Sequence, residues 1–181
     1  MAQFIAFDPK VEVNGETILS VVNTIAVGQE GRLAILKKHG INPEEGQWYK
    51  QQLWLNAFKE ISDELGDRTL FVIGKAIPEH AKFPPQIDNL QKALAAIDMA
   101  YHMNHRNGEI GKYTLKEFDD KKRKAVMVCS NPYPSEFDRG IISTMLRRFK
   151  PLDSVKYDVI LDTSKETRMK GGESCTYLVQ W

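Results

Sequence analysis

The sequence predicts an α+β protein in which helices come first and an antiparallel sheet follows. In the first half, apolar residues recur at helical spacing, most clearly at Trp54, Phe58, Ile61 and Leu65. In the second half, apolar and polar residues alternate as they do in strands, and glycine and proline turns separate the segments. This order favours helices packed against one face of a sheet.

Two helices are expected within the first forty residues. Asn14 can cap the first, and the second begins near Gln29 with Leu33 and Leu36 facing inward. Basic residues followed by Gly40 give the second helix a stop signal. The inward positions of the first helix are Ile18, Val21, Val22 and Ile25.

Three further helices are expected before the sheet. The strongest covers residues 47–65, because its apolar stripe is continuous, and Gly66 ends it. A shorter helix is placed at residues 68–77, although TLFVIG also fits a buried strand. The prolines of AIPEHAKFPPQ indicate a rigid loop, and a last helix is expected over residues 87–101.

The predicted sheet begins with a hairpin. Asn107-Gly108 is a preferred pair for a two-residue turn, because both positions need positive φ. The flanking strands are placed at residues 101–106 and 109–118. A second turn at residues 119–123 then leads into a strand at residues 124–130.

A proline turn, a helix and two strands complete the chain. The turn is Asn131-Pro132-Tyr133-Pro134, and Ser135 with Asp138 three residues later resembles a capping box. The helix that follows has an apolar stripe from Phe137 to Phe149, and Pro151 stops it. Alternating residues predict strands at 155–161 and 175–181, and the second ends on Trp181.

Length and charge limit the function classes. The 181 residues suit one domain, residues 1–181, with residues 1–45 as a helical extension and residues 46–181 as the core. The net charge of +1 gives no global field for nucleic acid. The first residues have no signal-peptide pattern and no stretch is long enough for a membrane span, so we expect a cytoplasmic protein.

Residues 126–181 resemble a known family. The segment NPYPSEFDRGIISTML, a strand, and then ETRMKGGESCTYLV resemble the vinyl-4-reductase-type small-molecule-binding domain. That family shares its fold with heme nitric-oxide-binding domains and with subunits of the TRAPP tethering complex. The resemblance implies helices and an antiparallel sheet that enclose an apolar cavity, and a homodimer that senses small aromatic or lipid-like molecules.

The resemblance also bears on cofactors. Gly171 and Cys175 match the family's final hairpin, but Ser135 and Thr167 stand where zinc-binding members have cysteines. Hydroxyl groups are poor zinc ligands, so zinc is not expected. A heme domain would need a proximal histidine and a tyrosine-serine-arginine signature. Tyr133 and Ser135 approach that signature, but Arg139 lacks the required spacing, so the sequence predicts no cofactor.

The sequence contains no established catalytic motif. It has no nucleophile elbow, no phosphate-binding glycine loop and no dinucleotide fingerprint. His102 and His105 would share a face on a helix but lie on opposite faces of a strand, and the hairpin signal favours the strand. A site made with Cys129 and Cys175 has no finger-like spacing, so no metal site is predicted.

We therefore expect a non-catalytic protein that binds a small hydrophobic or aromatic molecule and signals through a partner protein. One alternative is an enzyme acting on such a molecule, with His102, His105 or Asp138 as acid–base groups. A metal- or heme-dependent sensor is another alternative, as is an interaction protein with an aromatic dimer interface. The predicted ligand-binding residues are Trp54, Phe58, Tyr101, His102, Tyr133 and Phe137.

Overall fold

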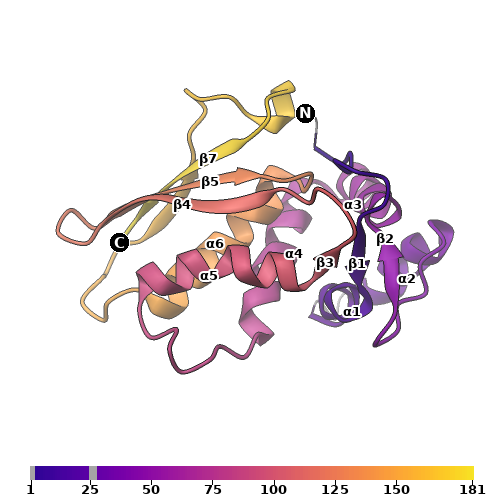
Figure 1. Cartoon of the computed structure of the whole chain (residues 1–181), viewed down its shortest axis with the longest axis horizontal. Coiled ribbons are helices and arrows are strands. Elements are labelled where there is room, and N and C mark those ends of the chain that lie inside the picture. The colour runs from indigo at the N-terminus through magenta and orange to yellow at the C-terminus, as the bar shows by residue number, and fades with distance from the viewer. Residues whose placement is uncertain (1–2, 25–27) are drawn as a thin grey trace.

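The computed structural model describes residues 3–24 and 28–181 and confirms the α+β class. A small three-stranded sheet with helices α1 to α3 forms one end, and a larger four-stranded sheet covers the other helices (Figure 1). The apolar core is continuous between the two parts. Within the described residues, no helix is both long enough and apolar enough to cross a membrane.

The first helices form as their start and stop signals indicate. Strand β1 (Glu12–Asn14) leads into α1 (Gly15–Thr24), and the Asn14 side chain accepts a hydrogen bond from the Thr17 amide at 2.9 Å. Helix α2 (Gln29–Lys38) is followed by Gly40 with φ 76°. Leu36 is buried as expected, but Leu33 is exposed. Ile25 lies outside the described residues.

The helix expected over residues 47–65 begins later. Residues Trp48–Lys50 form strand β2, which pairs with β1, and α3 runs from Gln51 to Leu65. Trp54, Phe58 and Ile61 are buried, but Leu65 is half exposed because it lies at the helix end.

Two helices follow and frame the cavity described below. Helix α4 (Asp67–His80) confirms the helical reading of TLFVIG over the strand reading, and it includes Pro78 in its last turns. The loop is therefore shorter than expected. Helix α5 (Leu90–Met103) begins after Asn89, whose side chain accepts a hydrogen bond from the Lys92 amide.

The hairpin predicted around Asn107-Gly108 is wrong, although the turn exists. Both residues have positive φ, 66° and 148°. Residues 101–103 still belong to α5, and the two-residue strand β3 (His105–Arg106) pairs with β1 in the small sheet. Strand β4 (Lys112–Asp119) pairs with β5 in the large sheet. The turn therefore joins two sheets instead of two strands of one sheet.

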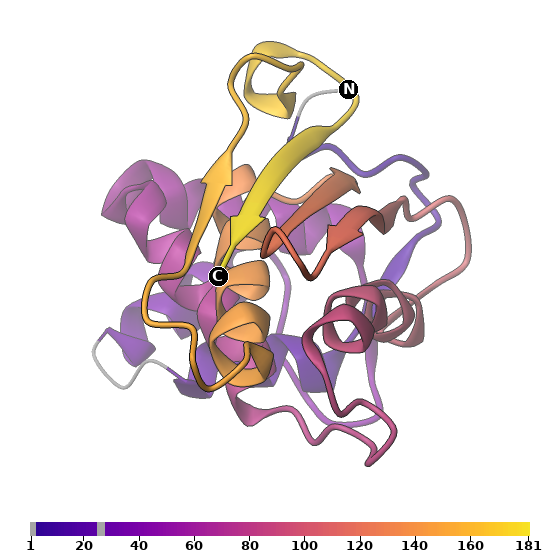
Figure 2. The same ribbon diagram turned by 90° about the vertical axis from the view of Figure 1, so that its left-hand side faces the viewer.

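The large sheet has the strand order β4-β5-β7-β6 and is antiparallel throughout. Strands β5 (Lys124–Ser130) and β7 (Cys175–Gln180) match the prediction closely, whereas β6 (Asp158–Leu161) is shorter. Alternate residues face α6 (Ser135–Phe149), which lies behind the sheet in Figure 2. A short 3₁₀ turn, η1 (Arg168–Lys170), precedes Gly171 in the β6–β7 connection.

The expected capping box at Ser135 does not form. Pro134 holds the cap position, and no side chain caps the helix. Ser135 is the first residue of the helix, and its amide donates a hydrogen bond to Gln3 Oε1 at 3.2 Å. Asp138 points into the protein and is fully buried, because it forms an ion pair there with Arg168.

Helices α4 and α6 cross at very short range through two glycines. A Cβ atom on Gly74 would lie 2.1 Å from the Phe137 carbonyl oxygen, and one on Gly140 would lie 2.3 Å from the Phe71 oxygen. Only glycine allows this approach, so the two helices form one tightly joined pair.

Candidate ligand cavity

An apolar cavity of about 100 Å³ lies between α4, α5 and α6. Its wall is formed mostly by aliphatic and aromatic side chains, with Thr17, Asn104 and His105 as polar additions. No lysine or arginine lines it among the described residues. The aliphatic part of the wall includes Ile77, Ile97, Ile141 and Met145.

The structure brings four of the six predicted ligand-binding residues to this cavity. Trp54, Tyr101, Tyr133 and Phe137 line it, from α3, α5, the proline turn and α6. Whether they bind a ligand stays a prediction.

The other two predicted residues lie elsewhere. Phe58 is buried behind the wall, where its ring packs edge-on against Trp54 at 4.4 Å and Phe137 at 5.1 Å between centroids. His102 is half exposed on α5, and its Nδ1 contacts the Asp98 carbonyl oxygen at 2.9 Å. His102 and His105 therefore share no site.

His105 is the polar residue of greatest chemical interest in the wall. Its Nδ1 lies 2.8 Å from the Tyr101 carbonyl oxygen, and its Nε2 lies 2.7 Å from the Tyr133 hydroxyl. A carbonyl oxygen only accepts hydrogen bonds, so Nδ1 carries the proton and Nε2 accepts from Tyr133. Burial lowers the pKa of His105 to about 4, against a smaller opposite effect of the Tyr101 carbonyl. The imidazole is therefore neutral at pH 7, with its lone pair on Nε2.

The sequence considered His105 but placed it on a hairpin strand. The missed signal is its position four residues after Tyr101, at the end of an amphipathic helix. There the ring stays beside Tyr101, with 4.3 Å between the two ring centroids. The aliphatic wall on α6 was foreseeable, because Ile141 and Met145 continue the stripe that begins at Phe137.

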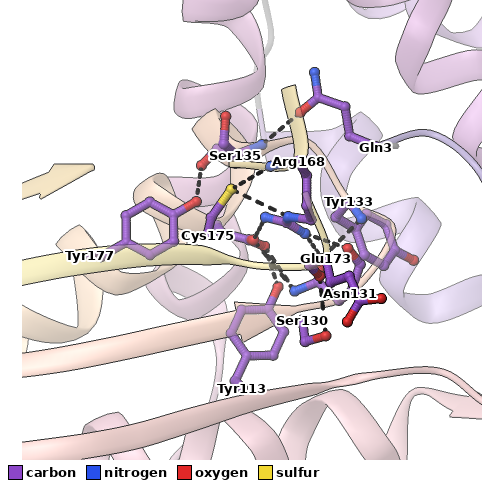
Figure 3. Close-up of polar contacts among 11 residues, drawn as sticks. Gln3, Tyr113, Ser130, Asn131, Tyr133, Ser135, Arg168, Glu173, Cys175 and Tyr177 are labelled. Atoms are coloured by element: carbon purple, nitrogen blue, oxygen red, sulfur yellow. Dashed lines mark hydrogen bonds and ion pairs between the residues drawn. The ribbon is translucent and has the colours of Figure 1, made fainter. Parts of the chain in front are cut away.

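A buried polar network lies next to the cavity (Figure 3). Arg168 and Asp138 form an ion pair with both side chains fully buried. Asp138 also accepts a hydrogen bond from the Tyr113 hydroxyl at 2.5 Å, and Arg168 donates to the carbonyl oxygen of Asn131. Burial raises the pKa of Asp138, and the guanidinium beside it acts in the opposite direction.

This network holds the β6–β7 connection against α6. Asp138 does not line the cavity, so its position gives no support to an acid–base role there. The amide and Nε of Arg168 both donate to Cys175 Sγ at 3.4 Å, and Cys129 lies directly opposite Cys175 in the sheet. No group of three or more histidine, cysteine or acidic side chains suited to a metal ion occurs in the described part of the chain.

Comparison with known proteins identifies the fold. The sequence matches no protein-family profile and no curated relative. Among solved structures, an H-NOX protein from S. oneidensis superposes with a TM-score of 0.69 at 11% identity, over 92% of this chain and 95% of that one. An oxygen-binding H-NOX domain related to soluble guanylate cyclases superposes with a TM-score of 0.62 at 15% identity, over 92% of this chain and 94% of that one. A structure from a study of heme distortion in the H-NOX family superposes with a TM-score of 0.63 at 15% identity, over 93% of this chain and 94% of that one.

These neighbours correct two expectations. They support the wider fold that includes heme nitric-oxide-binding domains, but nothing found supports membership of the vinyl-4-reductase family. The expectation of no cofactor is contradicted, because the neighbouring structures are H-NOX domains, described with heme or with Fe(II). The chain has the H-NOX fold. Heme is therefore the cofactor to be tested against the residues of the cavity.

Proposed function

We propose that the chain is a sensor domain whose cavity binds heme, with His105 as the protein ligand to the iron. The observation that carries the proposal is the neutral His105 in the wall of an apolar cavity of an H-NOX fold, whose Nε2 would exchange its hydrogen bond from the Tyr133 hydroxyl for the iron. Histidine that ligates a metal usually donates its other N–H to a carbonyl or carboxylate. The Tyr101 carbonyl already takes that part at His105.

The side chains of the cavity wall are chemically suited to heme, but the cavity is too small for it as it stands. Its aromatic and aliphatic side chains suit a porphyrin face. Its volume of about 100 Å³ is well below the roughly 300–1,000 Å³ of pockets for drug-sized ligands. Heme binding would therefore require α5 or the loop before it to move outward.

The charge pattern differs from that expected for a heme domain. Arg139 pairs with Glu136 at 2.6 Å and lies over the Phe71 ring at 4.2 Å, so it does not reach the cavity. Apart from His105 and the tyrosines, the polar residues of the lining are Thr17 and Asn104, and these would have to accommodate the heme propionates. When bound, heme would supply an iron centre for a diatomic gas.

Titration with hemin tests this proposal. The wild-type protein should develop a sharp Soret band at one equivalent, and His105→Gly should lose it and regain it when imidazole is added. His102→Ala is the matched control, because His102 lies outside the cavity, and should behave as wild type. A Soret band that is unchanged in His105→Gly without imidazole, or absent from the wild type, would contradict the assignment.

A second candidate is direct binding of a small apolar molecule, and the cavity volume favours it. An engineered cavity of about 150 Å³ in another protein binds benzene. The cavity of about 100 Å³ is of the same order. Toluene binding, followed by ligand-observed NMR, should be lost in Ala96→Leu, which fills the cavity, and kept in Ala95→Leu on the exposed side of α5. Equal binding by both variants would exclude the cavity as the site.

A further inference from the structure

The hydrogen bond between Tyr133 and His105 joins two walls of the cavity, and we call it the latch. His105 lies in β3, directly after α5, and Tyr133 lies in the proline turn that precedes α6. The Tyr133 hydroxyl donates to His105 Nε2 at 2.7 Å, and both side chains are buried and line the cavity. The latch therefore connects the end of α5 to the start of α6.

Tyr133 is held firmly in the proline turn. Pro132 and Pro134 restrict the backbone on both sides of it. The Tyr133 amide donates to Asn131 Oδ1 at 2.9 Å, and Asn131 accepts in turn from the buried guanidinium of Arg168. These contacts keep the Tyr133 hydroxyl in one position relative to α6.

His105 is attached to α5 instead. Its Nδ1 donates to the Tyr101 carbonyl oxygen in the last turn of that helix at 2.8 Å. Strand β3 contains two residues, His105 and Arg106, and it lies at the edge of the small sheet, where it pairs with β1. An outward movement of the end of α5 would therefore carry His105 away from Tyr133 and break the latch.

We propose that Tyr133 determines which ligands the cavity accepts, because its hydroxyl holds His105 and keeps the cavity closed at the end of α5. A molecule that fits the volume of about 100 Å³ binds with the latch intact. A larger molecule, such as a porphyrin, binds only when the latch is open, and the cost of opening lowers its affinity. This inference rests on the proposed function, in its heme form and in its small-molecule form.

The cost of opening comes from the two groups that the latch pairs. The surrounding wall is mostly aliphatic and aromatic, so an open latch leaves the Tyr133 proton and the His105 lone pair without an equivalent partner. One hydrogen bond of this kind corresponds to about a tenfold change in an equilibrium constant. In Tyr133→Phe the closed state has no such bond to lose, so opening becomes about tenfold more favourable.

Hydrogen exchange of the ligand-free protein tests the latch without any ligand. In Tyr133→Phe, the amide protons of residues 100–106 should exchange about tenfold faster than in the wild type, relative to those of α3. Tyr177→Phe is the matched control, because the Tyr177 hydroxyl is also buried but donates to the Ser135 carbonyl oxygen at 2.8 Å. It should leave exchange at residues 100–106 unchanged. Equal exchange there in the wild type and Tyr133→Phe would overturn the latch, whatever the cavity binds.

The ¹⁵N resonances of the His105 ring provide a second measurement and reveal whether Tyr133→Phe is folded. The Nε2 resonance should move downfield in this variant, toward the value of an imidazole nitrogen that accepts no hydrogen bond. The Nδ1 resonance should stay that of a protonated nitrogen, because its bond to the Tyr101 carbonyl is kept. An unchanged Nε2 resonance would contradict the role given to Tyr133.

Affinities for hemin and toluene test the selection by size. Hemin should bind Tyr133→Phe about tenfold more tightly than the wild type, and toluene should bind both proteins equally. An equal gain for both molecules, or hemin binding to both proteins with the same affinity, would refute selection by Tyr133. If hemin binds neither protein, the heme proposal fails, and the exchange experiment still decides whether the latch exists.

Discussion

Acid should destabilise this protein through His105. The unfolded chain gains a proton on this residue near its ordinary pKa of 6.5, whereas the folded protein keeps the ring neutral down to about pH 4 because burial disfavours the charge. Between these two values the unfolded state binds more protons, so stability falls as the pH falls. Above pH 6.5 the imidazole is neutral in both states, so His105 no longer lowers the stability of the folded protein.

The size of the effect follows from the two pKa values. One pKa unit corresponds to about 1.4 kcal/mol. The difference between 6.5 and about 4 therefore makes the folded state about 3 kcal/mol less stable at pH 4 than at pH 7.5, from this group alone. The side chain is nearly fully buried, so solvent screens little of this cost.

Urea denaturation of wild type and His105→Gln at several pH values between 7.5 and 4 measures this effect. Burial raises the pKa of Asp138, and this shift acts on stability with the opposite sign. Subtracting the free energy of unfolding of His105→Gln from that of the wild type at each pH removes the contribution of the groups that both proteins share. That difference should change by about 3 kcal/mol over the range. His102→Gln is the control for an exposed histidine and should follow the wild type. A difference between wild type and His105→Gln that stays constant would refute the argument.

Three further predictions concern stability and can be checked by the same denaturation experiment at pH 7.5. Gln51→Met should stabilise the ligand-free protein by about 1 kcal/mol, because it removes unpaired buried polar atoms; a loss would argue that they have partners. Asp138→Asn should cost about 3–5 kcal/mol, since it leaves the Arg168 guanidinium buried without its carboxylate, and adding Arg168→Met should recover part of the loss. Gly74→Ala should cost about 3 kcal/mol through its clash with α6, whereas Gly31→Ala, with open space around it in α2, should gain about 0.5–1 kcal/mol.

The elements that could be predicted from sequence are those with local signals. Strand β5 matches its prediction to the residue, because alternation runs between two clear turns. Helix α1 begins where Asn14 caps it. The start of α3 could not be placed, because residues 48–50 read equally well as a helical turn, and only pairing with β1 makes them a strand.

The failures at Asn107-Gly108 and Ser135 have one physical cause. Positive φ at a turn says that the chain reverses, but it does not say which strand each arm will pair with, and β1 competes successfully for β3. Ser135 and Asp138 have cap-like spacing, but a distant arginine binds Asp138 more strongly than the helix end does. Trp54, Tyr101 and Phe137 could be found by helical spacing, whereas His105 reaches the cavity through contacts between elements that sequence spacing does not record.

The glycine crossing of α4 and α6 decides which side of the cavity can yield. These two helices touch backbone to backbone at Gly74 and Gly140, so neither can move without separating that contact. Helix α5 has no such restraint, and it continues directly into β3 and the turn that joins the two sheets. Any molecule larger than the present cavity must therefore displace α5 or the loop before it, and a displacement of α5 is passed on to the junction of the two sheets. The fold thus has a fixed side and a movable side, and the movable side holds His105.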